Sequence, residues 1–122
     1  MRTLIQNIGQ GIKRILNAFK YSYDGFRATF KSEPAFRQDL VVFVVFTLFL
    51  FWLDVTRIER AVLFSSLLFI LIAECINTAI EVAIDRISTE IHPLSKKAKD
   101  IGSFIVLLSF VNAIVVWLVI LL

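Results

Sequence analysis

The residues best suited to chemistry lie within one apolar segment. Residues 61–84 are hydrophobic enough to cross a bilayer, yet they carry a set of polar side chains. These, with the acid just beyond the segment, are Glu74, Asn77, Thr78, Glu81 and Asp85. At about 100° per helical residue, all of them fall within about 60° of Glu74. A charge at bilayer depth costs roughly 3 kcal/mol or more, so we predict that this polar stripe is the functional site.

Paired carboxylates beside basic residues are suited to magnesium and phosphate. Oxygen ligands hold a hard cation such as Mg²⁺, and Lys or Arg neutralises phosphate oxygens. Glu33, Glu74 and Glu81 supply carboxylates, and Lys99 beside Asp100 supplies the positive charge. A Glu held away from water is also a suitable general base. The stripe therefore favours an enzyme that handles a magnesium-bound phosphate compound.

Plainer interpretations exist for the neighbouring residues. Asp85 could form an ion pair with Arg86 at the helix end, and His92 beside Pro93 could be an ordinary loop residue. The four glycines match neither a dinucleotide-binding nor a P-loop spacing. One His and one Cys form no zinc cluster, and no Ser–His–Asp arrangement is persuasive. These observations set aside several common enzyme classes.

Composition predicts a small integral membrane protein. The chain has 122 residues, of which 58% are hydrophobic, and a mean hydropathy of +0.82. A soluble domain of this length could not bury so much apolar surface. The net charge is only +3, and the basic residues flank the apolar segments. We therefore expect a membrane partner rather than nucleic acid, and a single domain over residues 1–122.

Residues 1–32 are predicted to form an amphipathic helix on the membrane surface. Apolar residues recur at steps of three and four, and basic residues lie on the flank or the opposite side. The apolar positions are Ile8, Ile12, Ile15, Phe19, Tyr23, Phe26 and Phe30. Three glycines, at positions 9, 11 and 25, could interrupt this helix.

Three transmembrane helices are predicted, at about residues 35–54, 61–86 and 100–122. Pro34 is suited to the first turn of a new helix. The uncharged stretch that follows has only 14 residues, whereas the last segment has 22. We expect a tight connection at 54–60 and a polar loop at 89–100.

The distribution of basic residues orients these spans. Eleven of the thirteen Lys and Arg residues fall on one side of the membrane if the chain crosses three times. The positive-inside rule then places the N-terminus in the cytoplasm and the C-terminus in the periplasm. The polar stripe is expected near the cytoplasmic surface.

Several motifs resemble those of the prokaryotic diacylglycerol kinase family. The core motif runs from Glu74 through Asn77 to Glu81, with the pattern Glu-x-x-Asn-Thr-Ala-x-Glu. The other matching segments are Asp85-Arg86, Ala98-Lys99-Asp100, Gly102-Ser103, Ala35-Phe36-Arg37-Gln38, Trp52-Leu53-Asp54-Val55 and Glu90-Ile91-His92-Pro93-Leu94-Ser95. The resemblance covers most of the chain.

This resemblance implies an all-α membrane protein that assembles as a homotrimer of three-span subunits, each with an N-terminal surface helix. It implies ATP-dependent phosphorylation of diacylglycerol to phosphatidic acid, with Mg²⁺ required, at the bacterial inner membrane. Family members in Gram-positive bacteria phosphorylate undecaprenol instead, which leaves that lipid as an alternative substrate.

The resemblance also implies residue roles. Glu74 is expected to be the catalytic base, and Asn77 to support it. Glu33 and Glu81 are expected to hold the metal on ATP. The further nucleotide contacts implied are Arg14, Tyr21, Glu90, His92, Lys99 and Asp100. The lipid-binding lining implied is Ala35, Phe36, Arg37, Gln38, Trp52, Glu74 and Ser103. Pro34, Asp39 and Tyr23 depart from residues common in the family, which bears on substrate fit.

Two other classes remain open on the residues alone. Intramembrane carboxylates are also used by proton- or ion-conducting oligomers. A membrane adaptor without enzymatic activity is a further alternative, and it would tolerate apolar substitutions along the stripe.

Overall fold

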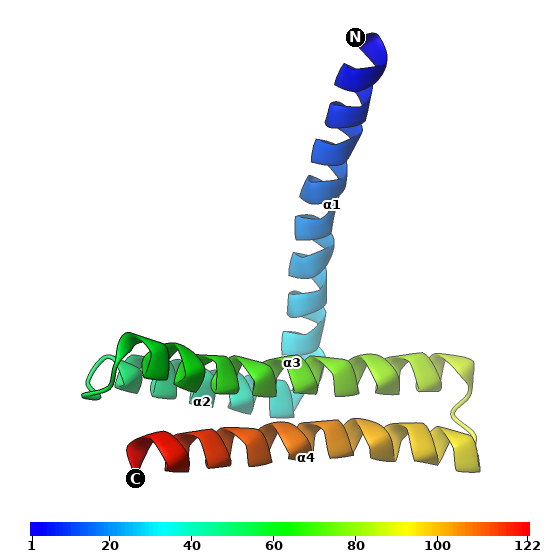
Figure 1. Cartoon of the computed structure of the whole chain (residues 1–122). Helices are drawn as coiled ribbons and strands as arrows, with labels where there is room; N and C mark the ends of the chain where they lie inside the picture. The colour runs from blue at the N-terminus through cyan, green and yellow to red at the C-terminus, as the bar shows by residue number, and fades with distance from the viewer. The chain divides into compact units, whose positions relative to one another are not determined.

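The computed structural model describes all residues, 1–122, and is entirely helical (Figure 1). Its helices are α1 (Arg2–Ser32), α2 (Pro34–Leu50), α3 (Arg57–Ile87) and α4 (Pro93–Leu121). The chain forms two compact units, Met1–Ser32 and Glu33–Leu122. The predicted all-α class is confirmed.

The first unit is the single helix α1. It runs without interruption through Gly9, Gly11 and Gly25, so the predicted breaks do not occur. None of its residues is buried, and apolar side chains such as Ile12 and Phe19 are exposed on one side of the helix. The unit therefore presents an uncovered apolar face, whose place on the membrane surface stays a prediction.

The second unit begins with α2 at the predicted break. Glu33 occupies the N-cap position in an extended conformation, and Pro34 stands at the first helical position, where its missing N–H costs nothing. The helix ends at Leu50, earlier than the predicted end near residue 54. The connection that follows is held by Arg60, which donates to the carbonyls of Leu53 and Val55 at 3.2 and 3.4 Å.

Helix α3 begins earlier than predicted because its sequence carries a capping box. The Thr56 hydroxyl accepts from the Glu59 N–H, and the Glu59 carboxylate accepts from the Thr56 N–H. Two otherwise unsatisfied donors are thereby satisfied. Residues 57–60 are consequently helical rather than part of the connection.

The predicted polar loop at residues 89–100 is wrong in most of its length. Helix α4 starts at Pro93, so Lys96, Lys97 and Lys99 lie on its first turns. His92 caps this helix by accepting the Leu94 N–H on Nδ1 at 3.1 Å. Proline at the first position and lysines, which are good helix formers, explain the earlier start.

Helices α2, α3 and α4 lie side by side in the second unit (Figure 1), with α3 packed against both neighbours. Small residues on α4 let it approach α3 closely; Gly102, Ser109 and Ala113 are buried there. The Trp117 indole N–H donates to the Ser66 hydroxyl at 3.0 Å and links the same two helices. The pair α3–α4 is therefore the tightest part of the fold.

Two of the helices, α3 and α4, are long and apolar enough to cross a membrane. Their outward side chains are largely apolar and exposed, as expected of surfaces that face lipid. Helix α2 has 17 residues and is shorter than these two. That α2 also crosses the membrane, as a third span, stays a prediction.

Candidate active site

The polar stripe of α3 continues the face that packs against the other helices. Ile70 and Ala73 are buried on this face, and Glu74, Asn77 and Glu81 follow it at helical spacing and are partly buried. Because these positions repeat every three or four residues, they share the direction of the core. The stripe is thus turned toward α2 and α4.

Glu74 lies within a cluster of carboxylates drawn from two helices and the turn before α2. One acidic neighbour is Asp39 on α2, whose carboxyl group lies close to that of Glu74. Glu81, two turns further along α3, and Glu33, at the start of α2, are its other acidic neighbours. The structure therefore places Glu33 and Glu81 near enough to Glu74 to act on its charge, as the sequence suggested.

Asp39 is the member of this cluster that sequence reasoning did not assign to the site. Its side-chain atom Oδ2 is buried without a hydrogen-bond partner. The available signal was an acid placed directly before the long uncharged run of α2, where burial of a charge is costly. That signal shows a constrained position, but not which partner it meets.

Asn77 connects the cluster to α4. Its side-chain Nδ2 donates to Glu81 Oε1 at 3.4 Å, and its Oδ1 is buried without a partner. The amide lies against Gly102, where an added Cβ would collide with Oδ1. In this structure, Asn77 therefore donates its hydrogen bond to Glu81 rather than to Glu74.

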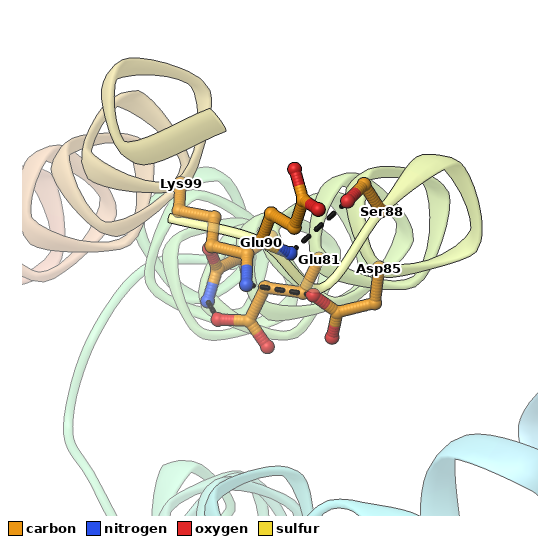
Figure 2. Close-up of polar contacts among 6 residues, drawn as sticks. Glu81, Asp85, Ser88, Glu90 and Lys99 are labelled. Atoms are coloured by element: carbon orange, nitrogen blue, oxygen red, sulfur yellow. Dashed lines mark hydrogen bonds and ion pairs between the residues drawn. The ribbon is translucent and has the colours of Figure 1, made fainter. Parts of the chain in front are cut away.

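Basic residues on the first turns of α4 meet the acidic end of α3. Lys99 Nζ pairs with Asp85 Oδ1 at 2.7 Å, with the two side chains 41% and 54% exposed (Figure 2). Asp85 thus pairs across helices, and the expected alternative of a pair with Arg86 is not what forms. Asp100 pairs with Lys96 on its own helix. Exposed pairs of this kind contribute about 0–1 kcal/mol, so an arriving phosphate can displace them.

The connection between α3 and α4 carries Glu90 and His92. The Glu90 N–H donates to the Ser88 hydroxyl at 3.0 Å, and its carboxylate is exposed (Figure 2). His92 uses Nδ1 as a helix cap, which leaves Nε2 as the nitrogen that can face a ligand. Glu90 and His92 are close to Lys99 in the sequence, and they lie at the same end of α3 and α4 as the Lys99–Asp85 ion pair.

The residues predicted to line the lipid site lie in three places. Ala35 to Gln38 form the first turn of α2, where Phe36 is 4% exposed and buried. Ser103 is exposed on α4 next to Gly102. Trp52 is 86% exposed in the connection after α2, and the 17 residues of α2 span about 25 Å, so it lies far from Glu74. The structure does not bring Trp52 to the cluster.

The two remaining predicted contacts, Arg14 and Tyr21, lie on α1 in the first unit. Both side chains are exposed there. Their role in nucleotide binding stays a prediction.

The donor set fits a metal ion that arrives with a nucleotide. No group of three or more acidic, His or Cys side chains is arranged to hold an ion by itself. Mg²⁺ in phosphate-transfer sites is commonly held by one or two carboxylates together with the phosphates. Glu33 and Glu81 both neighbour Glu74, and their service as such a pair stays a prediction.

Comparison with known proteins connects this arrangement to a family. The family described as prokaryotic diacylglycerol kinase matches residues 20–121 of the chain. A diacylglycerol kinase of Pseudomonas aeruginosa is 49% identical over 112 residues, covering 92% of this chain and 91% of that protein. A diacylglycerol kinase of Escherichia coli is 42% identical over 111 residues, covering 91% of each. One of Haemophilus influenzae is 38% identical over 107 residues, covering 88% of this chain and 91% of that protein.

Proposed function

We propose that this chain, which belongs to the prokaryotic diacylglycerol kinase family, phosphorylates diacylglycerol with ATP to give phosphatidic acid. The observation that carries the proposal is the gathering of Glu74, Glu81, Glu33 and Asp39 within an otherwise apolar helical unit. Buried acids are expensive in a membrane, and a lipid hydroxyl never leaves it. A site at this depth is suited to join the two substrates.

Glu74 is the group placed to act as general base. It accepts the proton of the primary hydroxyl as the lipid oxygen forms its bond to the γ-phosphorus of ATP. The bond from that phosphorus to the bridging oxygen breaks, and ADP leaves with the electron pair. Phosphoryl transfer depends on alignment and charge neutralisation more than on covalent chemistry. The carboxylates would supply alignment, and the neutralising charge would come from Lys99 and a bound cation.

Glu33 and Glu81 are the residues that would hold Mg²⁺ on the nucleotide. When bound, the ion would neutralise charge on the transferring phosphate. Asn77 supports this part of the site because its amide donates to Glu81 at 3.4 Å. The two carboxylates come from the turn before α2 and from α3, and we propose that the phosphates lie between them.

Lys99 is the cation placed to meet phosphate oxygens. It is already held at the acidic end of α3 by its 2.7 Å pair with Asp85. Because both partners are substantially exposed, the pair exchanges readily for a phosphate contact. Asp100, Glu90 and His92 lie at the same end and complete the nucleotide contacts that we propose, while Arg14 and Tyr21 enter on the family resemblance alone.

The lipid is proposed to enter beside the first turn of α2. Ala35, Phe36, Arg37 and Gln38 lie just before Asp39, and Ser103 lies next to the Gly102 contact on α4. Trp52 is assigned to the lipid lining by resemblance only. A chain running along α2 from Asp39 toward residue 52 would remain in hydrocarbon.

Membrane placement and assembly complete the proposal. We propose three spans, with α2 as the first of them, the N-terminus in the cytoplasm and the C-terminus in the periplasm of the inner membrane. The basic residues at the N-terminus, on α1 and at the start of α4 support this orientation. The homotrimer follows from the family resemblance, and the single kinase domain over residues 1–122 follows from the length and composition of the chain.

The test is phosphate transfer from radiolabelled ATP by the purified full-length chain in mixed micelles. Micelles that contain diacylglycerol are expected to yield labelled phosphatidic acid in the presence of Mg²⁺. Micelles that contain undecaprenol in its place are the matched comparison, and label on that lipid alone would assign the other substrate. Ion flux through liposomes without nucleotide, in the absence of any transfer, would contradict the kinase proposal.

A further inference from the structure

Gly102 lies in the interior of α4, where nothing about its own backbone requires glycine. No residue of the chain, glycine included, adopts a positive φ angle. Glycine in a helix interior is less stable than alanine, because it loses more conformational freedom on folding. The reason for a glycine at this position must therefore be space.

That space is filled by the side chain of Asn77 from α3. A Cβ added at Gly102 would collide with Asn77 Oδ1 and would lie 3.3 Å from Cγ and 3.6 Å from the backbone Cα. The amide would have to rotate away, because the added Cβ and Oδ1 cannot lie so close together. The other glycines, at positions 9, 11 and 25, have no atom within 4 Å of such a Cβ.

The position of the Asn77 amide against Gly102 determines where its N–H donor points. Oδ1 is buried toward Gly102 without a hydrogen-bond partner, and Nδ2 faces Glu81 Oε1 at 3.4 Å. The reverse orientation would set an amide oxygen against a carboxylate oxygen and leave both without a donor. Contact with α4 on one side and a carboxylate on the other therefore fix a single orientation.

We propose that Gly102 is a positioning residue, whose missing side chain holds the Asn77 amide so that it orients the Glu81 carboxylate for the metal–nucleotide complex. This inference rests on the proposed function for the identity of that complex. It assigns Asn77 to the metal carboxylate and gives α4 a part in aligning it.

The experiment compares Gly102→Ala, Asn77→Ala and the double variant, with Gly9→Ala as the matched control. Two quantities are measured for each full-length protein. One is the Mg²⁺ concentration for half-maximal turnover at fixed ATP, recorded together with the KM for diacylglycerol. The other is the midpoint of thermal unfolding in detergent without nucleotide.

Gly102→Ala is expected to raise the half-saturating Mg²⁺ concentration about three- to tenfold, the effect of weakening a hydrogen bond to a charged group. The KM for diacylglycerol should change less than twofold. In the Asn77→Ala background, the same substitution should leave the Mg²⁺ dependence unchanged and should not lower the unfolding midpoint, because the amide that it displaces is gone. Gly9→Ala should match the unaltered protein in Mg²⁺ dependence.

Equal losses from Gly102→Ala with and without the Asn77 amide would overturn the proposal, as would a Gly102→Ala protein that behaves like Gly9→Ala. An unaltered chain without lipid-dependent turnover would instead refute the proposed function. The unfolding midpoints still test the Gly102–Asn77 contact in that case, because Gly102→Ala is expected to lower the midpoint only when Asn77 is present.

Discussion

The carboxyl group of Asp39 on α2 lies close to the carboxyl group of Glu74 on α3. The contact joins α2 to α3 and places the predicted base beside a second acid. We predict that Asp39 orients Glu74, as a base needs if it is to meet a lipid hydroxyl.

Replacement of the base is the most direct prediction. Glu74→Gln keeps the size of the side chain and its hydrogen bonding but cannot accept the hydroxyl proton. We expect turnover to fall by about 10²–10⁴-fold. Binding of ATP, measured by equilibrium dialysis with Mg²⁺, should persist because the nucleotide residues are unchanged. Turnover near that of the unaltered protein would remove Glu74 from the role of base.

Substitution of Asp39 separates orientation from charge. Asp39→Asn can still donate a hydrogen bond to Glu74, so its kcat should stay within about threefold, whereas Asp39→Ala should lower kcat about tenfold. Asp54→Ala, at the exposed connection after α2, is the matched control and should have no such effect. Equal activity of the Ala and Asn variants would show that the hydrogen bond does not orient the base.

Glu81 is predicted to act through the metal. Glu81→Gln removes a charged oxygen ligand while keeping the shape of the side chain. The Mg²⁺ concentration for half-maximal turnover should rise about tenfold or more, and excess Mg²⁺ should restore part of the rate. Titration of turnover with Mg²⁺ checks this. A variant whose Mg²⁺ dependence is unaltered would place the metal elsewhere.

The Lys99–Asp85 pair is predicted to matter for nucleotide binding but little for stability. Lys99→Met should raise the KM for ATP several-fold, while the free energy of unfolding should change by less than about 1 kcal/mol, because the pair is exposed. Asp85→Asn releases the lysine and should leave the KM for ATP unchanged or lower. Lys97→Met serves as the control for loss of one positive charge on α4. An equal rise in KM for Lys97→Met would indicate a general charge effect.

Packing between α3 and α4 gives a prediction about stability. Trp117→Phe removes the hydrogen bond from the indole N–H to Ser66 and reduces the edge-to-face contact with Phe46, whose ring centroid lies 5.4 Å away. The Ser66 hydroxyl still donates to the Leu63 carbonyl at 2.6 Å, so no buried donor is left without a partner. We expect a loss of about 1–2 kcal/mol, measured by unfolding in mixed micelles. Trp52→Phe, at an 86% exposed position, should cost much less.

The helices and the face of the polar stripe were predictable because both depend on local periodicity. Spacing of three and four residues identified the stripe of α3, and Pro34 marked the start of α2. The boundaries were predicted less well. The run of charged residues suggested a loop up to residue 100. The helix α4 instead starts at Pro93, where His92 caps it, because lysines are tolerated at an exposed helix start.

The selection of Glu33, Glu74 and Glu81 also followed from the sequence, because acids in apolar segments are costly and their spacing is a local property. Tertiary structure decided which groups they meet. The approach of Asp39 to Glu74, the pairing of Lys99 with Asp85 and the fit of Asn77 against Gly102 all depend on how separate helices pack. A helical period gives the direction of a side chain around its own axis, whereas the partner it meets is set by the distance and register between axes, and these arise only when the helices pack together.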